Sequence, residues 1–555
     1  MITAEQRLIA QRDRYVAAVG ESWRGYEREL LIQLVRGLDV AAYNHRVARN
    51  GRSRDPEASM RVRGAATALR PLLEAVRGMP GGIPWSPSRL EYVPAFDNHL
   101  LACGRFTAAI RLAAMERYGM VRARRVGDDR IEMEAVSDAD EREEVDAGHA
   151  ASARARERFA SQRPDLTEQS PEVRRRLDEY GWPAMGWFIG YDNDKFLVEH
   201  YKALASVRAA GVLEAEALPL EGMVGGRPFS EWRDASTAAY GAVLHHIDAA
   251  GRLRDRHSKL NMRDLMTIFA RREDVVAVLA ERGDSHVRAM QLMAGLNLDA
   301  EGAGWCQDRH EIPLPYYIDA GEDFVLLPVF GGLMNPHAGL LDHLRRTFRT
   351  DWDRIVDGRE DVFRDHLRQL LPEPRYRVLE RGMELKRKNK SRLTDIDAIV
   401  LDRQTGTVVL VQLKWYDAHG FSLAERDSRR DNLLTKGNEW VEKVHGWVDG
   451  RTSAQLARTY SWGQAAEIPP QLLVMARHAS RFTGETRYDP RASWMSWHGL
   501  TEEMHKPGRD DFVTAIDHGR RRGKGRGGPT GTTLIELPGI TVEVRTAKRR
   551  PSRRA

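Results

Sequence analysis

The sequence contains few cysteines and lacks long hydrophobic stretches. Among its 555 residues only Cys103 and Cys306 are cysteines, which are too few for a disulfide framework or a cysteine-only metal site. No apolar run approaches the roughly 20 residues that a membrane-spanning helix needs. The N-terminus is charged and has no apolar core typical of a signal peptide. We therefore predict a soluble, cytoplasmic protein without a membrane partner.

Lysine is also scarce, because only 12 of the 86 basic residues are Lys. None precedes Lys195, and six of the twelve lie between Lys386 and Lys443. Lys is a compact point charge on a flexible stem, unlike the planar guanidinium of Arg. In a chain that otherwise uses Arg, this local cluster indicates a region where Lys itself is needed.

Positive charge is concentrated at the C-terminus. The whole chain carries a formal charge of +6, but residues 519–555 alone carry +9 and the other residues carry −3. A concentrated basic segment is typical of an arm that binds a polyanion such as nucleic acid, although a solvated tail gives the same pattern.

Composition and length are those of a globular protein with three or four domains, at about 150 residues per domain. Residues 1–345 read as a mainly helical region of unknown role, with a break near 78–95 and a hairpin over Val121–Val136. A second domain is expected over 350–500, and residues 501–555 form a C-terminal extension with the basic tail.

After about residue 351 the sequence pattern changes to one of alternating helices and strands. The expected elements are a helix over Arg359–Leu371, strands over Arg377–Leu385, Ile396–Leu401 and Thr407–Trp415, a helix over Asn432–Val448 and a strand over Gln471–Ala476. These elements predict a small mixed sheet flanked by helices. The predicted fold class is therefore α/β, with a mostly α-helical N-terminal region followed by an αβββαβ domain.

Two of these strands place four polar side chains on one face. If Arg403–Gly406 is a four-residue hairpin loop, Asp397 lies opposite Gln412 and Asp395 lies opposite Lys414. The neighbouring residues are apolar, as in a strand buried on both faces. Buried polar and charged groups destabilise a fold unless they pair or bind metal. This face of the hairpin is therefore either a solvent-exposed surface with Asp–Lys pairs or a functional site.

The same residues resemble the PD-(D/E)XK, or restriction-endonuclease-like, nuclease superfamily. Here Asp397 is followed by an apolar strand, a short turn, a second apolar strand and Gln412-Leu413-Lys414. In that family an acid ends one strand, and a Glu-x-Lys or Gln-x-Lys sequence ends the next. The flanking elements over about residues 355–480 are also similar to the family's αβββαβ core. The Gln-x-Lys form is similar to the Mrr-like branch.

The resemblance implies a catalytic set of Asp397, Gln412 and Lys414, acting with Mg²⁺ or Mn²⁺. Asp397 would be the main carboxylate ligand, and the Gln412 amide oxygen and the Leu413 carbonyl would be further ligands. Lys414 would stabilise the phosphate or position the attacking water. A divalent cation polarises the phosphate and lowers the pKa of a bound water, which is the chemistry that phosphodiester hydrolysis needs.

Gln412 departs from the commoner Glu and removes one negative charge from this set. Candidate compensating acids are Asp395, Glu384 and Glu360. The family often carries a Glu on the first helix; Arg364 occupies the matching position here, and Glu360 lies one turn earlier.

Basic residues near the motif are candidates for contact with a phosphate backbone. They are Lys386, Arg387, Lys388, Lys390 and Arg392 in one loop, and Lys436 on the following helix. A solvated, charged turn is the alternative interpretation of the loop.

The sequence thus predicts a metal-dependent endonuclease that acts on nucleic acid, with DNA favoured over RNA, in restriction or anti-phage defence. One alternative is a catalytically inactive nuclease fold that binds nucleic acid, because Gln412 weakens the metal site. A second alternative is a non-enzymatic scaffold or signalling protein. A homodimer, or a partner protein bound through the helical N-terminal region, is also expected.

Overall fold

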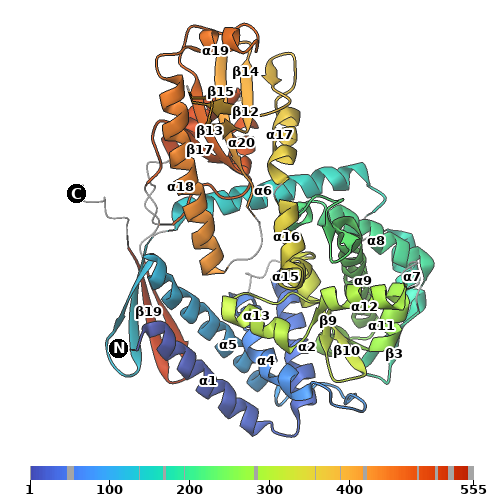
Figure 1. The fold of residues 1–555 in the computed structure, drawn as a ribbon. Coiled ribbons are helices and arrows are strands. Elements are labelled where there is room, and N and C mark those ends of the chain that lie inside the picture. Colours follow the sequence, from blue (N-terminus) through green and yellow to red (C-terminus); the bar gives the residue numbers. More distant parts are fainter. Residues whose placement is uncertain are drawn as a thin grey trace.

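The chain forms a mixed α/β protein whose two parts are visible in Figure 1. A large helical part comprises most residues before about 356, and a smaller part places a sheet between helices. The computed structural model describes residues 2–46, 56–136, 138–166, 170–192, 194–280, 285–356, 358–387, 389–416, 422–483, 487–506, 511–522 and 531–547.

Most helices belong to the large part. They are α1 (Ala4–Ser22), α2 (Glu27–Arg46), α3 (Pro56–Arg63), α4 (Ala65–Val76), α5 (Val93–Ala114), η1 (Met115–Tyr118), α6 (Ala139–Gln162), α7 (Pro171–Tyr180), α8 (Lys195–Ala209), η2 (Leu213–Glu216), α9 (Phe229–Arg256), α10 (Met262–Leu265), α11 (Arg272–Ala280), α12 (His286–Leu296), α13 (Ala300–Arg309), α14 (Phe330–Met334), α15 (Ala338–Thr347) and α16 (Arg349–Val356). The smaller part contains α17 (Arg359–Leu370), α18 (Leu423–Val448), α19 (Ser453–Thr459), α20 (Trp497–Met504) and α21 (Phe512–Arg522).

The strands form several separate sheets. In the large part they are β1 (Val121–Arg125), β2 (Arg130–Val136), β3 (Gly181–Ala184), β4 (Phe188–Tyr191), β5 (Met223–Val224), β6 (Arg227–Pro228), β7 (Ile268–Arg271), β8 (Asn297–Leu298), β9 (Tyr317–Asp319) and β10 (Phe324–Leu327). Later strands are β11 (Tyr376–Val378), β12 (Met383–Lys386), β13 (Arg392–Ile396), β14 (Ala398–Asp402), β15 (Thr407–Lys414), β16 (Gln471–Ala476), β17 (Ser493–Ser496), β18 (Gly531–Leu537) and β19 (Ile540–Ala547).

The sheet that carries the predicted motif has the order β11-β14-β15-β16-β17. Strand β14 is antiparallel to β11 and β15, whereas β15, β16 and β17 run parallel. Side chains of α17, α20 and α21 cover one face, and those of α18 and α19 cover the other. Because side chains alternate along a strand, Val409 and Val411 of β15 face the first group and Val408 and Leu410 face the second.

The sequence predicts several of these elements closely. Strand β16 coincides with the predicted Gln471–Ala476, and the predicted hairpin over Val121–Val136 is present as β1 and β2. The predicted register of the β14–β15 hairpin is confirmed, with Asp402 opposite Thr407. Gly406 has a φ of +70° in the connecting turn, a conformation that glycine adopts without strain.

One predicted strand is wrong, because the segment Arg377–Leu385 is divided in two. Its beginning is β11 of the central sheet, whereas its end is β12, which pairs with β13 in a separate two-stranded sheet. The chain crosses closely at Gly382, where a Cβ atom would lie 2.4 Å from the carbonyl oxygen of Ile396. A side chain at residue 382 would therefore not fit, and this glycine allows the hairpin to leave the sheet.

The C-terminal extension returns to the beginning of the chain. Strand β19 lies between β18 and β2, so that β1, β2, β19 and β18 form one four-stranded sheet. Val542 of β19 packs in a core with Leu8 of α1 and Phe106 of α5. The predicted basic extension therefore includes an ordered hairpin over residues 531–547, while residues 523–530 and 548–555 lie outside the described structure.

The large part has its own cores, built mainly from helices α2–α5 and α8–α15. The predicted break near 78–95 lies between α4 and α5, where residues 77–92 form neither helix nor strand. Among the described residues, no helix is long and apolar enough to cross a membrane.

Helix α6 joins the two parts by passing along the smaller one (Figure 1). Its Glu141 accepts hydrogen bonds from the Arg426 guanidinium of α18. One turn later, Glu144 accepts hydrogen bonds from the backbone N–H groups of Ser480 and Arg481 at 2.6 and 2.8 Å. These buried carboxylates fix the position of the smaller part relative to α6.

Candidate functional site

The predicted residues Asp397, Gln412, Leu413 and Lys414 meet where β14 begins and β15 ends. Asp397 lies between Ile396 of β13 and the first residue of β14. Its Oδ2 accepts a hydrogen bond from the Leu413 N–H at 2.7 Å and another from the Gln412 amide nitrogen. The structure therefore brings the predicted acid and the Gln-x-Lys sequence into direct contact.

Local strand geometry explains this contact. The Asp397 N–H donates to the Val411 carbonyl at 3.1 Å, but the residues before Asp397 belong to β13, which pairs with β12 instead. The Leu413 N–H therefore has no partner on β14 and bonds to the Asp397 side chain instead. Gln412 is only 5% exposed, so its amide lies inside the fold beside this carboxylate.

Helix α17 contributes a second carboxylate to the cluster. Glu360, in its first turn, lies with Oε1 3.3 Å from the Lys414 ammonium nitrogen. Arg364, one turn further along, donates a hydrogen bond to the Asp397 carbonyl oxygen. Of the three candidate compensating acids, Glu360 is the one whose side chain contacts the predicted catalytic lysine.

The charge of Asp397 is only partly compensated. Burial raises its pKa to about 6, although the nearby Lys414 and the Leu413 N–H favour the ionised form. Glu360 and Asp395 add to the rise because they are also negative. A cation bound at this place would favour ionisation of Asp397.

Asp395 and Glu384 lie elsewhere than predicted. Asp395 was expected opposite Lys414, but it belongs to β13 and is paired with Glu384 of β12. Arg392 forms an ion pair with Asp395 at 3.3 Å, and Lys386 forms one with Glu384 at 3.7 Å. The prediction that Asp395 shares the hairpin face is therefore wrong, because the chain joins the central sheet only after Asp397.

The predicted basic loop is the tip of the β12–β13 hairpin. Lys386, Arg387, Lys390 and Arg392 are exposed there, while Lys388 lies outside the described residues. Several of these groups have partners within the hairpin: Arg387 donates to the Arg392 carbonyl at 2.6 Å, in addition to the two ion pairs above. Lys436 is exposed on α18.

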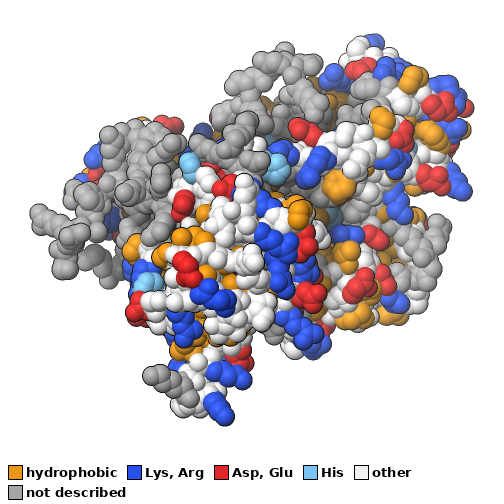
Figure 2. All heavy atoms as spheres, turned by 90° about the horizontal axis from the view of Figure 1, so that it is seen from above, with side chains coloured by type: hydrophobic (Ala, Val, Ile, Leu, Met, Phe, Trp, Pro, Cys, Tyr) orange, Lys and Arg blue, Asp and Glu red, His pale blue; other side chains and the backbone are white. Residues whose placement is uncertain are grey.

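The face of the molecule that is seen from above carries both charges. In the view from above, Lys and Arg side chains gather near the middle of the face, with Asp and Glu side chains among them (Figure 2). This face therefore offers local basic groups rather than a uniformly positive surface.

The donor set fits a hard divalent cation with a small number of protein ligands. Within the described residues, no group of three or more His, Cys, Asp or Glu side chains is placed to hold a metal ion. Magnesium, however, is commonly held by one or two carboxylates and keeps several waters. Asp397 and Glu360 supply carboxylates, and the Gln412 amide supplies an oxygen once its O and N exchange places, which a rotation about its last bond allows.

Tyr416 is a residue at this site that the sequence interpretation missed. Its buried hydroxyl has no hydrogen-bond partner among the described residues. Burial and the charge of Glu360 raise the pKa of this hydroxyl well above its usual value, so it remains a proton donor. The signal was present in the sequence, because Gln412, Lys414 and Tyr416 follow the alternation of one strand face.

Comparison of the chain with family models, with curated proteins and with solved structures finds no match in any of the three. The interpretation of the site therefore depends on its geometry and chemistry.

Proposed function

We propose that the chain is a metal-dependent nuclease that hydrolyses phosphodiester bonds, with DNA favoured over RNA. The observation that carries this proposal is the contact of Asp397 with Gln412 and Leu413, next to Lys414 and Glu360. Carboxylate, amide and ammonium groups meet at one end of a central hairpin, which is where Mg²⁺ or Mn²⁺ and a phosphate would need them.

The order of the elements supports a PD-(D/E)XK-like, restriction-endonuclease-like core. Helix α17 precedes β11, β14 and β15; helix α18 follows them and precedes β16, which is parallel to β15. This gives the αβββαβ sequence, with the β12–β13 hairpin inserted before β14. Fold alone does not define function, so the proposal depends on the side chains at the site.

Each residue has a role in this proposal. Asp397 and Glu360 hold the cation, with the Gln412 amide and the Leu413 carbonyl as neutral oxygen ligands. Bound there, the cation would lower the pKa of a water and polarise the phosphate. Lys414 stabilises the charge that develops on the phosphate oxygens, and its position depends on its ion pair with Glu360.

The basic hairpin tip and Lys436 would contact the phosphate backbone, which makes binding salt-dependent. Cleavage of both strands by a chain with one such site would suit a homodimer. Restriction or defence against phage is the biological setting that we propose for this activity.

The test is a cleavage assay on plasmid DNA, linear duplex DNA and RNA, each with Mg²⁺, Mn²⁺ or EDTA. We expect metal-dependent cleavage by the parent chain and none by the Asp397→Ala or Lys414→Ala variants. Asp361→Ala is the matched control, because Asp361 is adjacent to Glu360 on α17 but its side chain is 78% exposed and pairs with Arg364.

Cleavage that survives in both variants would contradict the assignment of the site. If the parent chain binds DNA but neither cleaves it nor binds Mn²⁺, the inactive nucleic-acid-binding alternative is correct. If it also fails to bind DNA at low salt, the scaffold alternative is favoured, because phosphate contacts strengthen as salt falls.

A further inference from the structure

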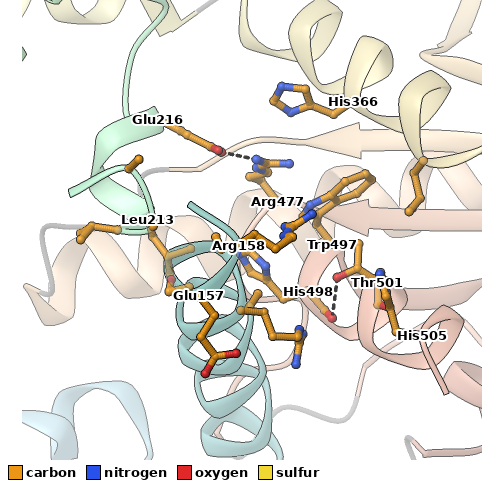
Figure 3. Close-up of a pocket in the computed structure, with 18 of the residues that line it drawn as sticks. Glu157, Arg158, Leu213, Glu216, His366, Arg477, Trp497, His498, Thr501 and His505 are labelled. Atoms are coloured by element: carbon orange, nitrogen blue, oxygen red, sulfur yellow. Dashed lines mark hydrogen bonds and ion pairs between the residues drawn. The ribbon is translucent and has the colours of Figure 1, made fainter. Parts of the chain in front are cut away.

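A cavity of about 820 Å³ lies between the two parts of the molecule, away from the site described above. Helix α6 and the segment 210–216 form one side, and α17, α20 and Arg477 at the end of β16 form the other (Figure 3). Neither Asp397 nor Lys414 is among the residues that line it. Its volume is in the range of cavities that hold small molecules, which is about 300–1,000 Å³.

Arg477 is the buried cation of this cavity. It is 4% exposed, follows the last residue of β16, and is ion-paired with Glu216 from the opposite part. Its guanidinium lies 4.9 to 5.5 Å from the ring centres of three aromatic side chains, which are Phe363, Trp415 and Trp497. These ring contacts hold the guanidinium in place, and Figure 3 shows Arg477 and Trp497 side by side at the cavity.

The buried polar groups in the wall are incompletely satisfied. Within the described part of the chain, Nε and Nη1 of Arg477 and Nε2 of His498 have no hydrogen-bond partner. His498 is only 7% exposed. Buried donors without partners cost stability, and they are found where a ligand or water completes them.

The cavity also has an excess of positive charge. Arg154 and Arg158 reach it from α6, and Arg477 from the end of β16, against Glu157 and Glu216. Burial, followed by the charges of Arg477 and Arg154, lowers the pKa of His498 to about 4. With three arginines against two glutamates, the wall favours an anion.

We infer that this cavity binds a phosphorylated small molecule of nucleotide size, with Arg477, Arg154 and Arg158 on its phosphate groups. Guanidinium groups match phosphate oxygens with paired hydrogen bonds, which a point charge does not. The half-buried ring of Trp497 gives the cavity an aromatic wall, which suits a ligand that also carries a planar ring.

The cavity is mechanically connected to the candidate active site. The Arg477 N–H donates to the Lys414 carbonyl at 2.8 Å, and Ala476 lies opposite Lys414 in the parallel pair β15–β16. Helix α17 carries His366 in the cavity and Glu360 at the site. A ligand that moves Arg477 or α17 would therefore change the position of Lys414, and this consequence alone rests on the proposed nuclease function.

The test is isothermal titration calorimetry of the full chain with AMP, ATP, adenosine, inorganic phosphate and a single-stranded oligonucleotide. We expect AMP or ATP to bind, and adenosine and phosphate to bind at least about tenfold more weakly. The double variant Arg154→Ala/Arg158→Ala should weaken nucleotide binding at least about tenfold. Arg142→Ala, an exposed change nearer the start of α6, should leave it unchanged.

Thermal melting curves would verify that all variants remain folded. The inference is overturned if neither nucleotide binds at millimolar concentration, if the double variant binds nucleotide as tightly as the parent, or if the double variant weakens only oligonucleotide binding. Lys414→Ala separates this inference from the proposed function, because it should abolish cleavage while retaining nucleotide binding.

Discussion

The two ends of strand β14 each hold an aspartate, and their surroundings have opposite effects. Burial opposes the ionisation of Asp402, but Arg375 and the Gln404 N–H lower its pKa below the ordinary value. Burial raises the pKa of Asp397 to about 6 at the other end, because the nearby Lys414 only partly offsets it. The partners of Asp402 outweigh the cost of burying its charge, whereas those of Asp397 do not.

The difference distinguishes a structural carboxylate from a candidate functional one. Asp402 fixes a turn, since its oxygens accept from the Gln404 N–H at 2.9 Å and pair with Arg375 at 3.2 Å. Asp397 shares its neighbourhood with Glu360, which adds negative charge. A buried carboxylate with a raised pKa beside other charged groups is a candidate functional group.

The largest expected effect tests the difference between Asp397 and Asp402 directly. Asp397→Asn should reduce metal-dependent cleavage at least about 100-fold, because it removes the main charged ligand. Asp402→Asn should retain cleavage but lower the free energy of unfolding by about 2 kcal/mol, because it removes a buried ionic hydrogen bond. Single-turnover cleavage and urea denaturation measure the two effects. Equal losses of cleavage in both variants would contradict the distinction.

A second effect extends the comparison to the carboxylates of α6. Burial raises the pKa of Glu144 to about 7, from an ordinary value near 4.5. The folded protein thus binds this proton more tightly, so the stabilisation is present below pH 4.5 and is lost as the pH rises through 7. Glu144→Gln removes this dependence: relative to the variant, the parent should lose about 3 kcal/mol between pH 4.5 and 8.

Glu141→Gln is the matched control, measured by urea denaturation at the same pH values. Burial opposes the ionisation of Glu141, but the Arg426 guanidinium lowers its pKa overall. Its stabilisation is therefore present above its ordinary pKa, and the variant should be less stable than the parent at pH 8. A Glu144→Gln variant that follows the same pH trend as Glu141→Gln would show that the two carboxylates do not differ.

A third prediction concerns a second negative charge placed beside Asp397. Gln412→Glu would place a second carboxylate next to Asp397, which should strengthen Mn²⁺ binding about tenfold. Without metal the same variant should be less stable, because two adjacent buried carboxylates disfavour ionisation. Calorimetric titration with Mn²⁺ and melting in EDTA test both parts. Stronger binding without loss of stability would mean that the two carboxylates do not interact.

The smallest effect concerns the partner of Lys414. Glu360→Gln removes one carboxylate from a half-exposed position and should weaken Mn²⁺ binding a few-fold, measured by calorimetry. Asp361→Asn, on the same turn of α17 but pointing to solvent, is the control and should bind as the parent does. No difference between the two variants would exclude Glu360 as a ligand.

Local patterns in the sequence predicted the part of the fold that depends on neighbouring residues. The β14–β15 register follows from a four-residue turn and strand alternation. The same pairing rule predicted that Asp397 lies beside Gln412. The predicted position of Asp395 was wrong because the pairing rule assumes a straight strand, whereas the chain bends at Asp397. Gly382 allows a close approach next to this bend, and the contact involves the Ile396 carbonyl, 14 residues away.

Features that join distant segments were not predictable in this way. Nothing in the pattern of Val542 or Val544 indicates that β19 pairs with β2 rather than forming part of a free tail. The cavity at Arg477 likewise requires α6 and β16 to meet, more than 300 residues apart. Such contacts depend on tertiary packing, which a periodic pattern does not encode.

The position of β19 beside β2 has a consequence for how the chain folds during synthesis. Strand β2 pairs with the neighbouring β1, but its other edge is completed by residues 541–547, about 400 residues further along the chain. Until then the edge is an unpaired template for other chains. Deletion of β18 and β19 should therefore cause aggregation of nascent chains, while the sheet around β15 would still form.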